Sequence, residues 1–172
     1  LPGGCAIGRR PLDIHLSGLQ RMGASIELNG ERLLARAPWG LRGADITFRY
    51  PSVGATENIM MAAVLARGET VIRNAAREPE IADIQAFLNA MGARVEGAGT
   101  AVIRVRGVAE LGSADHTVMP DRIEAGTYLL ALLITGGEGS IFPVRPEHLS
   151  SLLNAIRSMG AEIAVDGSRV TL

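Results

Sequence analysis

The chain has 172 residues and a formal net charge of −1, which argues against bulk affinity for nucleic acid or for a membrane surface. Apolar residues make up 47% of it, enough to bury a sizeable core in one large domain or two smaller units. A single cysteine excludes an internal disulfide, and no apolar stretch is long enough to span a bilayer. We therefore expect a cytoplasmic protein.

The first residues, LPGGCAIGRRPLD, place Cys5 in a glycine-rich loop directly before Arg9 and Arg10. A free cysteine is most often a small buried side chain, but this loop offers few apolar neighbours to bury the sulfur. The two guanidinium groups favour a thiolate, whereas an anionic substrate held by them would disfavour it. The thiol is a candidate proton donor or nucleophile, and the spacing leaves both roles open.

Three later stretches repeat one pattern: the end of a helix, Met-Gly-Ala, a short strand, a glycine turn and a second strand. The glycines are Gly23, Gly92 and Gly160, at spacings of 69 and 68 residues (92 − 23 and 160 − 92). Each glycine is expected to end its helix in the left-handed conformation. The full unit reads strand, buried helix, strand, amphipathic helix, strand, strand, and its first copy is truncated.

Two helices, expected over residues 54–68 and 124–137, are apolar almost all round beyond their first turn, which predicts that they are buried. Strands such as AVIRVRG, residues 101–107, alternate apolar residues with arginine and should have one face in water. The polarity therefore predicts an α/β (α+β) fold with helices inside and half-exposed sheets outside.

The segment YPSVGATEN, residues 50–58, joins a strand to the first buried helix, with Ser52, Gly54 and Thr56 at the helix start. The N-terminus of a helix offers free amides and a positive dipole end, which suit a phosphate group. Ordinary N-capping by Ser52 or Thr56 explains the same residues.

Two further segments, NAAREPEI and MPDRIEAGT, hold charged residues at helix starts. Glu78 and Glu80 complement a helix dipole if they are only structural, and Asp121, Arg122 and Glu124 fit a capping and hinge segment. The three histidines are scattered and no second cysteine exists, so we expect no metal site.

Together, the strings LPGGCAIGRRPLD, PSVGATENIMMAA, NAAREPEI and MPDRIEAGT, in this order, closely resemble the UDP-N-acetylglucosamine 1-carboxyvinyltransferase (enolpyruvyl transferase) family. Its members are more than twice as long, so the resemblance implies a middle fragment. It also implies two inside-out α/β barrels built from such units. Residues 1–119 would end the first barrel domain, with one truncated and one complete unit, and residues 120–172 would begin the second.

The resemblance implies transfer of the enolpyruvyl group of phosphoenolpyruvate to the 3-hydroxyl of UDP-N-acetylglucosamine, the first committed step of peptidoglycan synthesis. It implies no cofactor. Cys5 would be the catalytic proton donor and the residue that fosfomycin alkylates. Several of the family's catalytic residues have no counterpart in this chain, so we expect these 172 residues alone to be inactive.

The implied site residues fall into three segments. The residues that match substrate-binding positions are Arg10, Pro11, Leu12, Asp13, Ile14, Tyr50, Pro51, Ser52, Val53, Gly54 and Glu78. Asp121, Arg122 and Glu124 match the crossover between the family's two domains and are an expected hinge. Some members carry a lysine where Tyr50 stands, so this chain departs from them by one positive charge.

Two other functions stay open. The related shikimate-pathway enolpyruvyl transferase shares the fold but lacks the cysteine loop. A non-catalytic binding module of the same fold is the other alternative. Self-association is also expected, because single repeat units leave the apolar faces of their helices exposed.

Overall fold

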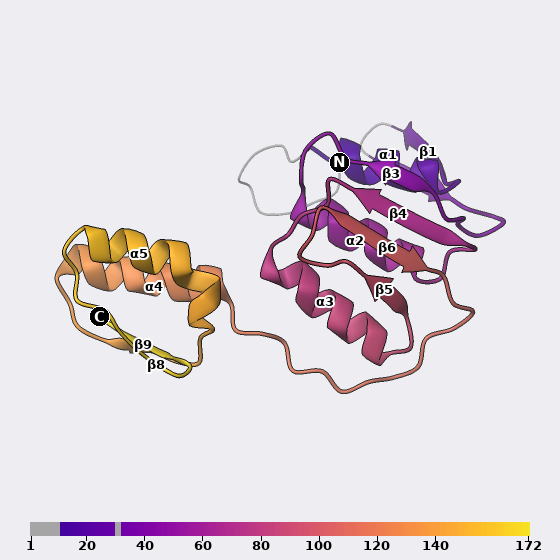
Figure 1. Ribbon diagram of the computed structural model, residues 1–172. Coiled ribbons are helices and arrows are strands. Elements are labelled where there is room, and N and C mark those ends of the chain that lie inside the picture. The colour runs from indigo at the N-terminus through magenta and orange to yellow at the C-terminus, as the bar shows by residue number, and fades with distance from the viewer. Residues whose placement is uncertain (1–10, 30–31) are drawn as a thin grey trace. The chain divides into compact units, whose positions relative to one another are not determined.

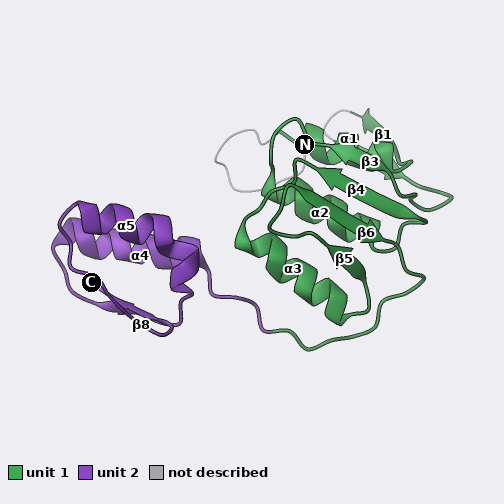
Figure 2. Cartoon of the chain, viewed as in Figure 1, with its two compact units in different colours: residues 1–116 green, residues 117–172 purple. Residues whose placement is uncertain are grey.

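The computed structural model describes residues 11–29 and 32–172 and divides the chain into two compact units, residues 1–116 and 117–172 (Figure 2). Two predicted site residues, Cys5 and Arg10, lie outside the described residues. The assignment of residues 1–119 and 120–172 to two barrel domains stays a prediction.

The first unit is a sheet covered by helices on one face, with a separate hairpin (Figure 1). Its elements are α1 (Asp13–Arg21), β1 (Ser25–Asn29), β2 (Arg32–Arg36), β3 (Asp45–Thr47), α2 (Val53–Ala63), β4 (Glu69–Arg73), α3 (Pro79–Ala90), β5 (Arg94–Glu96) and β6 (Val102–Arg106). The sheet has the order β3-β4-β6-β5, with β3 parallel to β4 and the other neighbours antiparallel. The hairpin pairs β1 with β2.

The second unit packs two helices beside a small antiparallel sheet. Its elements are α4 (Arg122–Thr135), β7 (Ser140–Ile141), the 3₁₀ helix η1 (Pro146–Leu149), α5 (Ser150–Ser158), β8 (Ala164–Asp166) and β9 (Arg169–Thr171). The strands follow the order β7-β9-β8.

The predicted repeat is confirmed for the middle copy, whereas the last copy has no opening strand, because no strand lies between β6 and α4 in this described part of the chain. Residues 45–106 run strand, helix, strand, helix, strand, strand, as expected for one complete unit. The helices before Gly23, Gly92 and Gly160 end at these glycines, whose φ values are 97°, 98° and 97°. Only glycine adopts this left-handed conformation without a steric penalty, so the same residue ends each helix.

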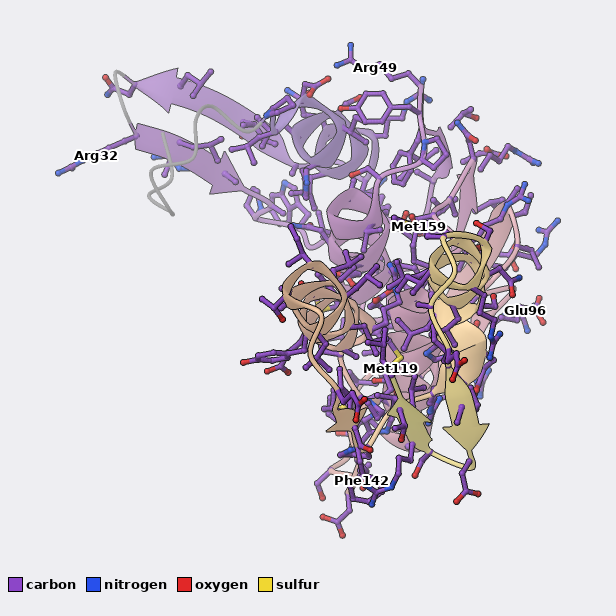
Figure 3. The ribbon with its side chains drawn as sticks, turned by 90° about the vertical axis from the view of Figure 1, so that its left-hand side faces the viewer. Arg32, Arg49, Glu96, Met119, Phe142 and Met159 are labelled. Atoms are coloured by element: carbon purple, nitrogen blue, oxygen red, sulfur yellow. The ribbon has the colours of Figure 1, made fainter. Side chains whose placement is uncertain are left out.

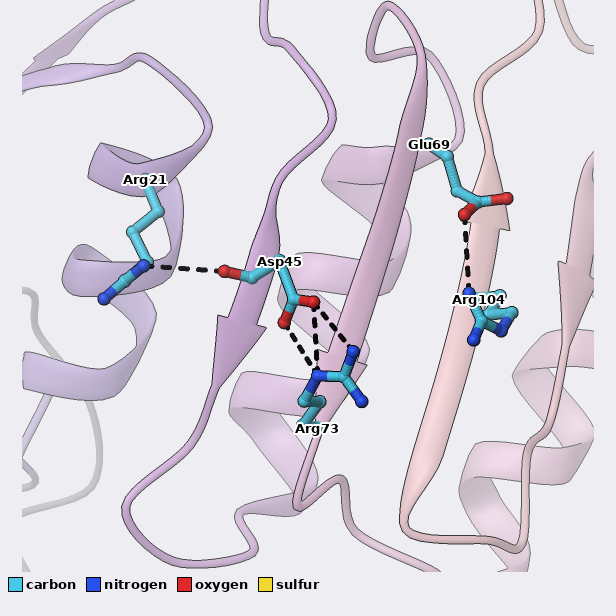
Figure 4. A network of polar contacts seen from close by, with 5 residues as sticks. All are labelled: Arg21, Asp45, Glu69, Arg73 and Arg104. Atoms are coloured by element: carbon cyan, nitrogen blue, oxygen red, sulfur yellow. Dashed lines mark hydrogen bonds and ion pairs between the residues drawn. The ribbon is translucent and has the colours of Figure 1, made fainter.

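The four-stranded sheet has one apolar and one charged face. In β6, Ile103 and Val105 are fully buried, whereas Arg104 and Arg106 are exposed. The charged face carries a network of ion pairs and hydrogen bonds (Figure 4). Within it, Arg73 donates to both carboxylate oxygens of Asp45, with an Nη2–Oδ2 distance of 2.9 Å. The predicted wet outer face is confirmed.

Helix α2 is the centre of the first core. Its side chains Ala55, Ile59, Met60 and Ala63 are at most 1% exposed and pack against the apolar face of the sheet. The prediction of a buried helix over residues 54–68 is therefore confirmed in part, because the helix ends at Ala63 and Met61 is 49% exposed.

Helix α4 meets that prediction on one side only. Ala125, Gly126 and Leu129 are buried, but Ile134 is 86% exposed and Tyr128 is 58% exposed. The apolar core of this unit lies between α4, η1 and α5, so only one side of the helix is covered. In the part of the chain that the structure describes, no helix is both long and apolar enough to cross a membrane.

Candidate functional site

The candidate site in the first unit lies where the first turns of α1 and α2 meet. Helix α1 opens at Asp13 and helix α2 opens at Val53. The ring of His15 lies over Gly54, because its Cε1 atom is 3.5 Å from the point that a Cβ on Gly54 would occupy. Two positive helix ends are therefore close together, which favours an anion at this place.

Ser52 is the N-cap of α2. Its backbone is extended, with φ −134° and ψ 119°, and its Oγ accepts a hydrogen bond from the amide of Ala55 at 3.3 Å. The capping role considered for Ser52 is therefore confirmed. A helix start has four amides without partners in its own helix, so one cap still leaves donors for a ligand.

Thr56 does not cap the helix; it ties α2 to a distant segment. Its fully buried Oγ1 donates to the carbonyl of Ser52 at 2.7 Å and accepts from the amide of Ala76 at 3.1 Å. The start of α2 and the segment that leads to Glu78 are therefore held side by side through one hydroxyl.

Glu78 stands at the N-cap position of α3 without a capping hydrogen bond from its side chain. Its Oε2 instead accepts from the amide of Arg77 at 2.8 Å. The segment before it is fixed by Asn74, which has φ 56° and donates from Nδ2 to the carbonyl of Phe48 at 3.0 Å. These bonds bring Glu78 to the same end of the sheet as Tyr50 and Ser52.

Arg49 is a residue of this site that the sequence reasoning missed. It forms an ion pair and a hydrogen bond with Asp13 at the start of α1. Its guanidinium carbon also lies 5.4 Å from the centre of the Tyr50 ring, within cation–π range. Figure 3 labels this side chain at the surface of the first unit. The signal in the sequence was a cation directly before the YPSVG segment.

Glu57 is a second missed residue. Burial raises the pKa of its carboxyl group, and the nearby charge of Glu80 raises the pKa further. Glu57 lies beyond the first turn of α2 and Glu80 lies in the first turn of α3, so the two helices contribute neighbouring carboxylates.

Asp121, Arg122 and Glu124 belong to the second unit. Asp121 caps α4, because its Oδ1 accepts from the amides of Ile123 at 2.7 Å and Glu124 at 3.1 Å. A cavity of about 360 Å³ lies beside this helix start, and its lining includes Tyr128 and Phe142. The capping role considered for this segment is confirmed, and its hinge role stays a prediction.

The described residues include no group of three or more His, Cys, Asp or Glu side chains that could hold a metal ion. His116 instead pairs with Asp83, at 3.1 Å between Nε2 and Oδ2, and stacks on Phe87 with ring centres 5.0 Å apart. This pair fixes the end of the first unit against α3.

The arrangement of strands and helices matches the fold of solved enolpyruvyl transferases. The enolpyruvyl transferase NikO from Streptomyces tendae matches 95% of this chain and 42% of its own, with a TM-score of 0.79 at 20% identity. EPSP synthase from Acinetobacter baumannii matches 98% of this chain and 40% of its own, with a TM-score of 0.67 at 23% identity. At these identities the likeness shows the fold, and it confirms the fold that the sequence predicted.

The chain belongs to the EPSP synthase (3-phosphoshikimate 1-carboxyvinyltransferase) family, whose model matches residues 1–171. Among curated relatives, UDP-N-acetylglucosamine 1-carboxyvinyltransferase 1 of Symbiobacterium thermophilum is 60% identical over 99% of this chain. UDP-N-acetylglucosamine 1-carboxyvinyltransferase of Rhodospirillum centenum is 58% identical over 95% of it. The resemblance seen in the motifs is confirmed. The chain spans 38% of the length of each of these two relatives.

Proposed function

We propose that this chain is part of an enzyme that transfers the enolpyruvyl group of phosphoenolpyruvate to the 3-hydroxyl of UDP-N-acetylglucosamine. The observation that supports this most is the meeting of the α1 and α2 helix starts, within a sequence 60% identical to a UDP-N-acetylglucosamine 1-carboxyvinyltransferase. The reaction would serve peptidoglycan synthesis in the cytoplasm, and through it cell wall growth and division.

Both substrates are anions, and the described part of the site would mainly bind the nucleotide-sugar. The diphosphate of the nucleotide-sugar would lie at the start of α2, against Ser52, Val53 and Gly54, where helix amides and the dipole stabilise negative charge. The segment from Arg10 to Ile14 would line the nucleotide-sugar, and Glu78 would lie near the pocket.

The proposed reaction is an addition followed by an elimination. The sugar hydroxyl passes its proton to a general base as its oxygen bonds to C2 of phosphoenolpyruvate, while C3 accepts a proton from a separate donor, which gives a tetrahedral intermediate. Loss of a C3 proton and departure of phosphate from C2 then restore the double bond. Cys5 would donate the first proton, so its thiol must keep that proton until the substrates are bound.

The alternative substrate is 3-phosphoshikimate, which the description of the family model names. The 60% and 58% identities to UDP-N-acetylglucosamine enzymes, against 23% to the EPSP synthase structure, favour the nucleotide-sugar. The Cys5 loop favours it as well.

The test is a phosphate-release assay on the complete reading frame that contains this sequence. We expect phosphate release from phosphoenolpyruvate that requires UDP-N-acetylglucosamine, and loss of that activity in Cys5→Ala. Fosfomycin should label Cys5 faster when the nucleotide-sugar is present. Release that depends on 3-phosphoshikimate instead would refute the proposal, and turnover by these 172 residues alone would refute the expected inactivity of the fragment.

A further inference from the structure

Arg49 contacts two of the predicted binding residues at once. Its guanidinium group pairs with Asp13 from the first turn of α1 and lies over the ring of Tyr50, which leads into α2. Asp13 and Arg49 are 36 positions apart in the sequence, so the fold brings this cation to the meeting point of the two helices.

Among the described residues, most donors of the guanidinium group have no hydrogen-bond partner. It has five N–H donors, and its hydrogen bond from Nη2 to Oδ2 of Asp13 uses one of them. Its side chain is 66% exposed, so a ligand can reach the remaining donors. Asp13 and Tyr50 restrict the position of the group before any ligand arrives, which lowers the entropy that binding would cost.

The charges around the helix starts favour a further cation, besides the proposed Arg10, if a diphosphate binds there. Asp13, Glu57, Glu78 and Glu80 contribute carboxylates from the described elements of this region. A bound diphosphate would add further negative charge, which the helix ends alone offset only partly. Tyr50 carries no positive charge, whereas Arg49, one residue earlier, always does.

We propose that Arg49 is a further substrate-binding residue, whose guanidinium group donates hydrogen bonds to the diphosphate of the nucleotide-sugar at the start of α2. The tyrosine ring at position 50 supports the guanidinium group, and the carboxylate of Asp13 orients it. This inference rests on the proposed function, because it assigns a residue to the same substrate. If Arg49 formed only a surface ion pair, it would stabilise the fold slightly and its loss would leave the affinity for the nucleotide-sugar unchanged.

The experiment compares the affinity of the complete protein for UDP-N-acetylglucosamine, by calorimetry, in the wild type, Arg49→Ala and Arg73→Ala. Arg73→Ala is the matched control, because it removes another exposed arginine–aspartate pair, with Asp45, on the charged face of the sheet that α2 does not cover (Figure 4). We expect Arg49→Ala to raise Kd by about 10- to 100-fold, the effect of losing hydrogen bonds to a charged group. Arg73→Ala should stay within about twofold of the wild type.

A rescue variant separates binding from folding. Tyr50→Lys, added to Arg49→Ala, returns a cation to the next position and should recover at least about half of the lost affinity on a logarithmic scale. UDP, used as a probe without the sugar, should show the same loss in Arg49→Ala, since the contact is to the diphosphate.

Unchanged affinity in Arg49→Ala, or a loss that Tyr50→Lys does not reduce, would overturn the assignment. A loss seen with UDP-N-acetylglucosamine but not with UDP would overturn the diphosphate contact. A wild-type protein that binds no UDP-N-acetylglucosamine would overturn the proposed function and this inference together, so the two failures are distinguishable.

Discussion

The hydroxyl of Thr56 links the start of α2 to the segment before Glu78, and replacing Thr56 with valine tests that link. The substitution keeps the shape of the side chain and removes the oxygen that accepts from the amide of Ala76 at 3.1 Å. Ala76 is fully buried, so its N–H would lose its partner away from water. The carbonyl of Ser52 keeps its intrahelical bond from the amide of Thr56, at 2.9 Å. The main cost is therefore one unpaired buried donor.

An unsatisfied buried donor costs about 1–3 kcal/mol, and we expect Thr56→Val to lower the free energy of unfolding by that amount. Thr70 provides a matched control, because it is also fully buried but its Oγ1 has no hydrogen-bond partner among the described residues. Thr70→Val should be neutral or stabilising, since it replaces an unpaired hydroxyl with a methyl group in a strand.

The assay is urea unfolding of the complete protein, with hydrogen exchange of the Ala76 amide as a local measurement. Thr56→Val should shift the unfolding midpoint downward with little change in slope and speed exchange at Ala76. Equal stability of Thr56→Val and Thr70→Val, with unchanged exchange at Ala76, would refute the reasoning.

Three further predictions concern the first unit. Asn89→Ala removes the side-chain amide that pairs with the N–H and C=O of Val95 on the edge strand β5, at 2.9 and 2.8 Å, and should cost about 1–2 kcal/mol in urea unfolding. The raised pKa of Glu57 means that ionisation of its carboxyl group disfavours the folded state. The stability of Glu57→Gln relative to wild type should therefore increase as the pH rises above 4.5, the ordinary pKa of a glutamate. A constant difference in the free energy of unfolding between the two proteins from pH 4 to 7 would contradict this. Hydrogen bonding to Arg73 lowers the pKa of Asp45 below its ordinary value of 3.8. The stability that the Asp45 carboxylate contributes is therefore present above pH 3.8 and is lost as the pH falls through the lowered pKa of the folded state. When the free energy of unfolding is measured at decreasing pH below 3.8, Asp45→Asn should lose less stability than the wild type.

Features that depend on neighbouring residues in the sequence could be predicted. Gly23 and its two counterparts end helices because a left-handed residue is needed at that point, which the Met-Gly-Ala repeat reveals directly. The capping by Ser52 follows from the same kind of local pattern. The apolar and charged faces of β6 follow from its alternating residues.

Features that depend on distant contacts could not be predicted. The ion pair of Arg49 with Asp13 and the bridge from Thr56 to Ala76 join residues 36 and 20 positions apart, and nothing local in the sequence marks either pairing. The partial exposure of α4 also depends on distant contacts. An all-apolar helix indicates that its burial is favourable, but not which other element covers it.

The central claim is that the start of α2 binds the diphosphate of a nucleotide-sugar. The most direct measurement is hydrogen exchange of the Val53 and Gly54 amides in the complete protein, with UDP-N-acetylglucosamine or with 3-phosphoshikimate added. We predict that exchange at these two amides slows with UDP-N-acetylglucosamine and not with 3-phosphoshikimate. Unchanged exchange with the nucleotide-sugar, or slowing by 3-phosphoshikimate alone, would contradict the claim.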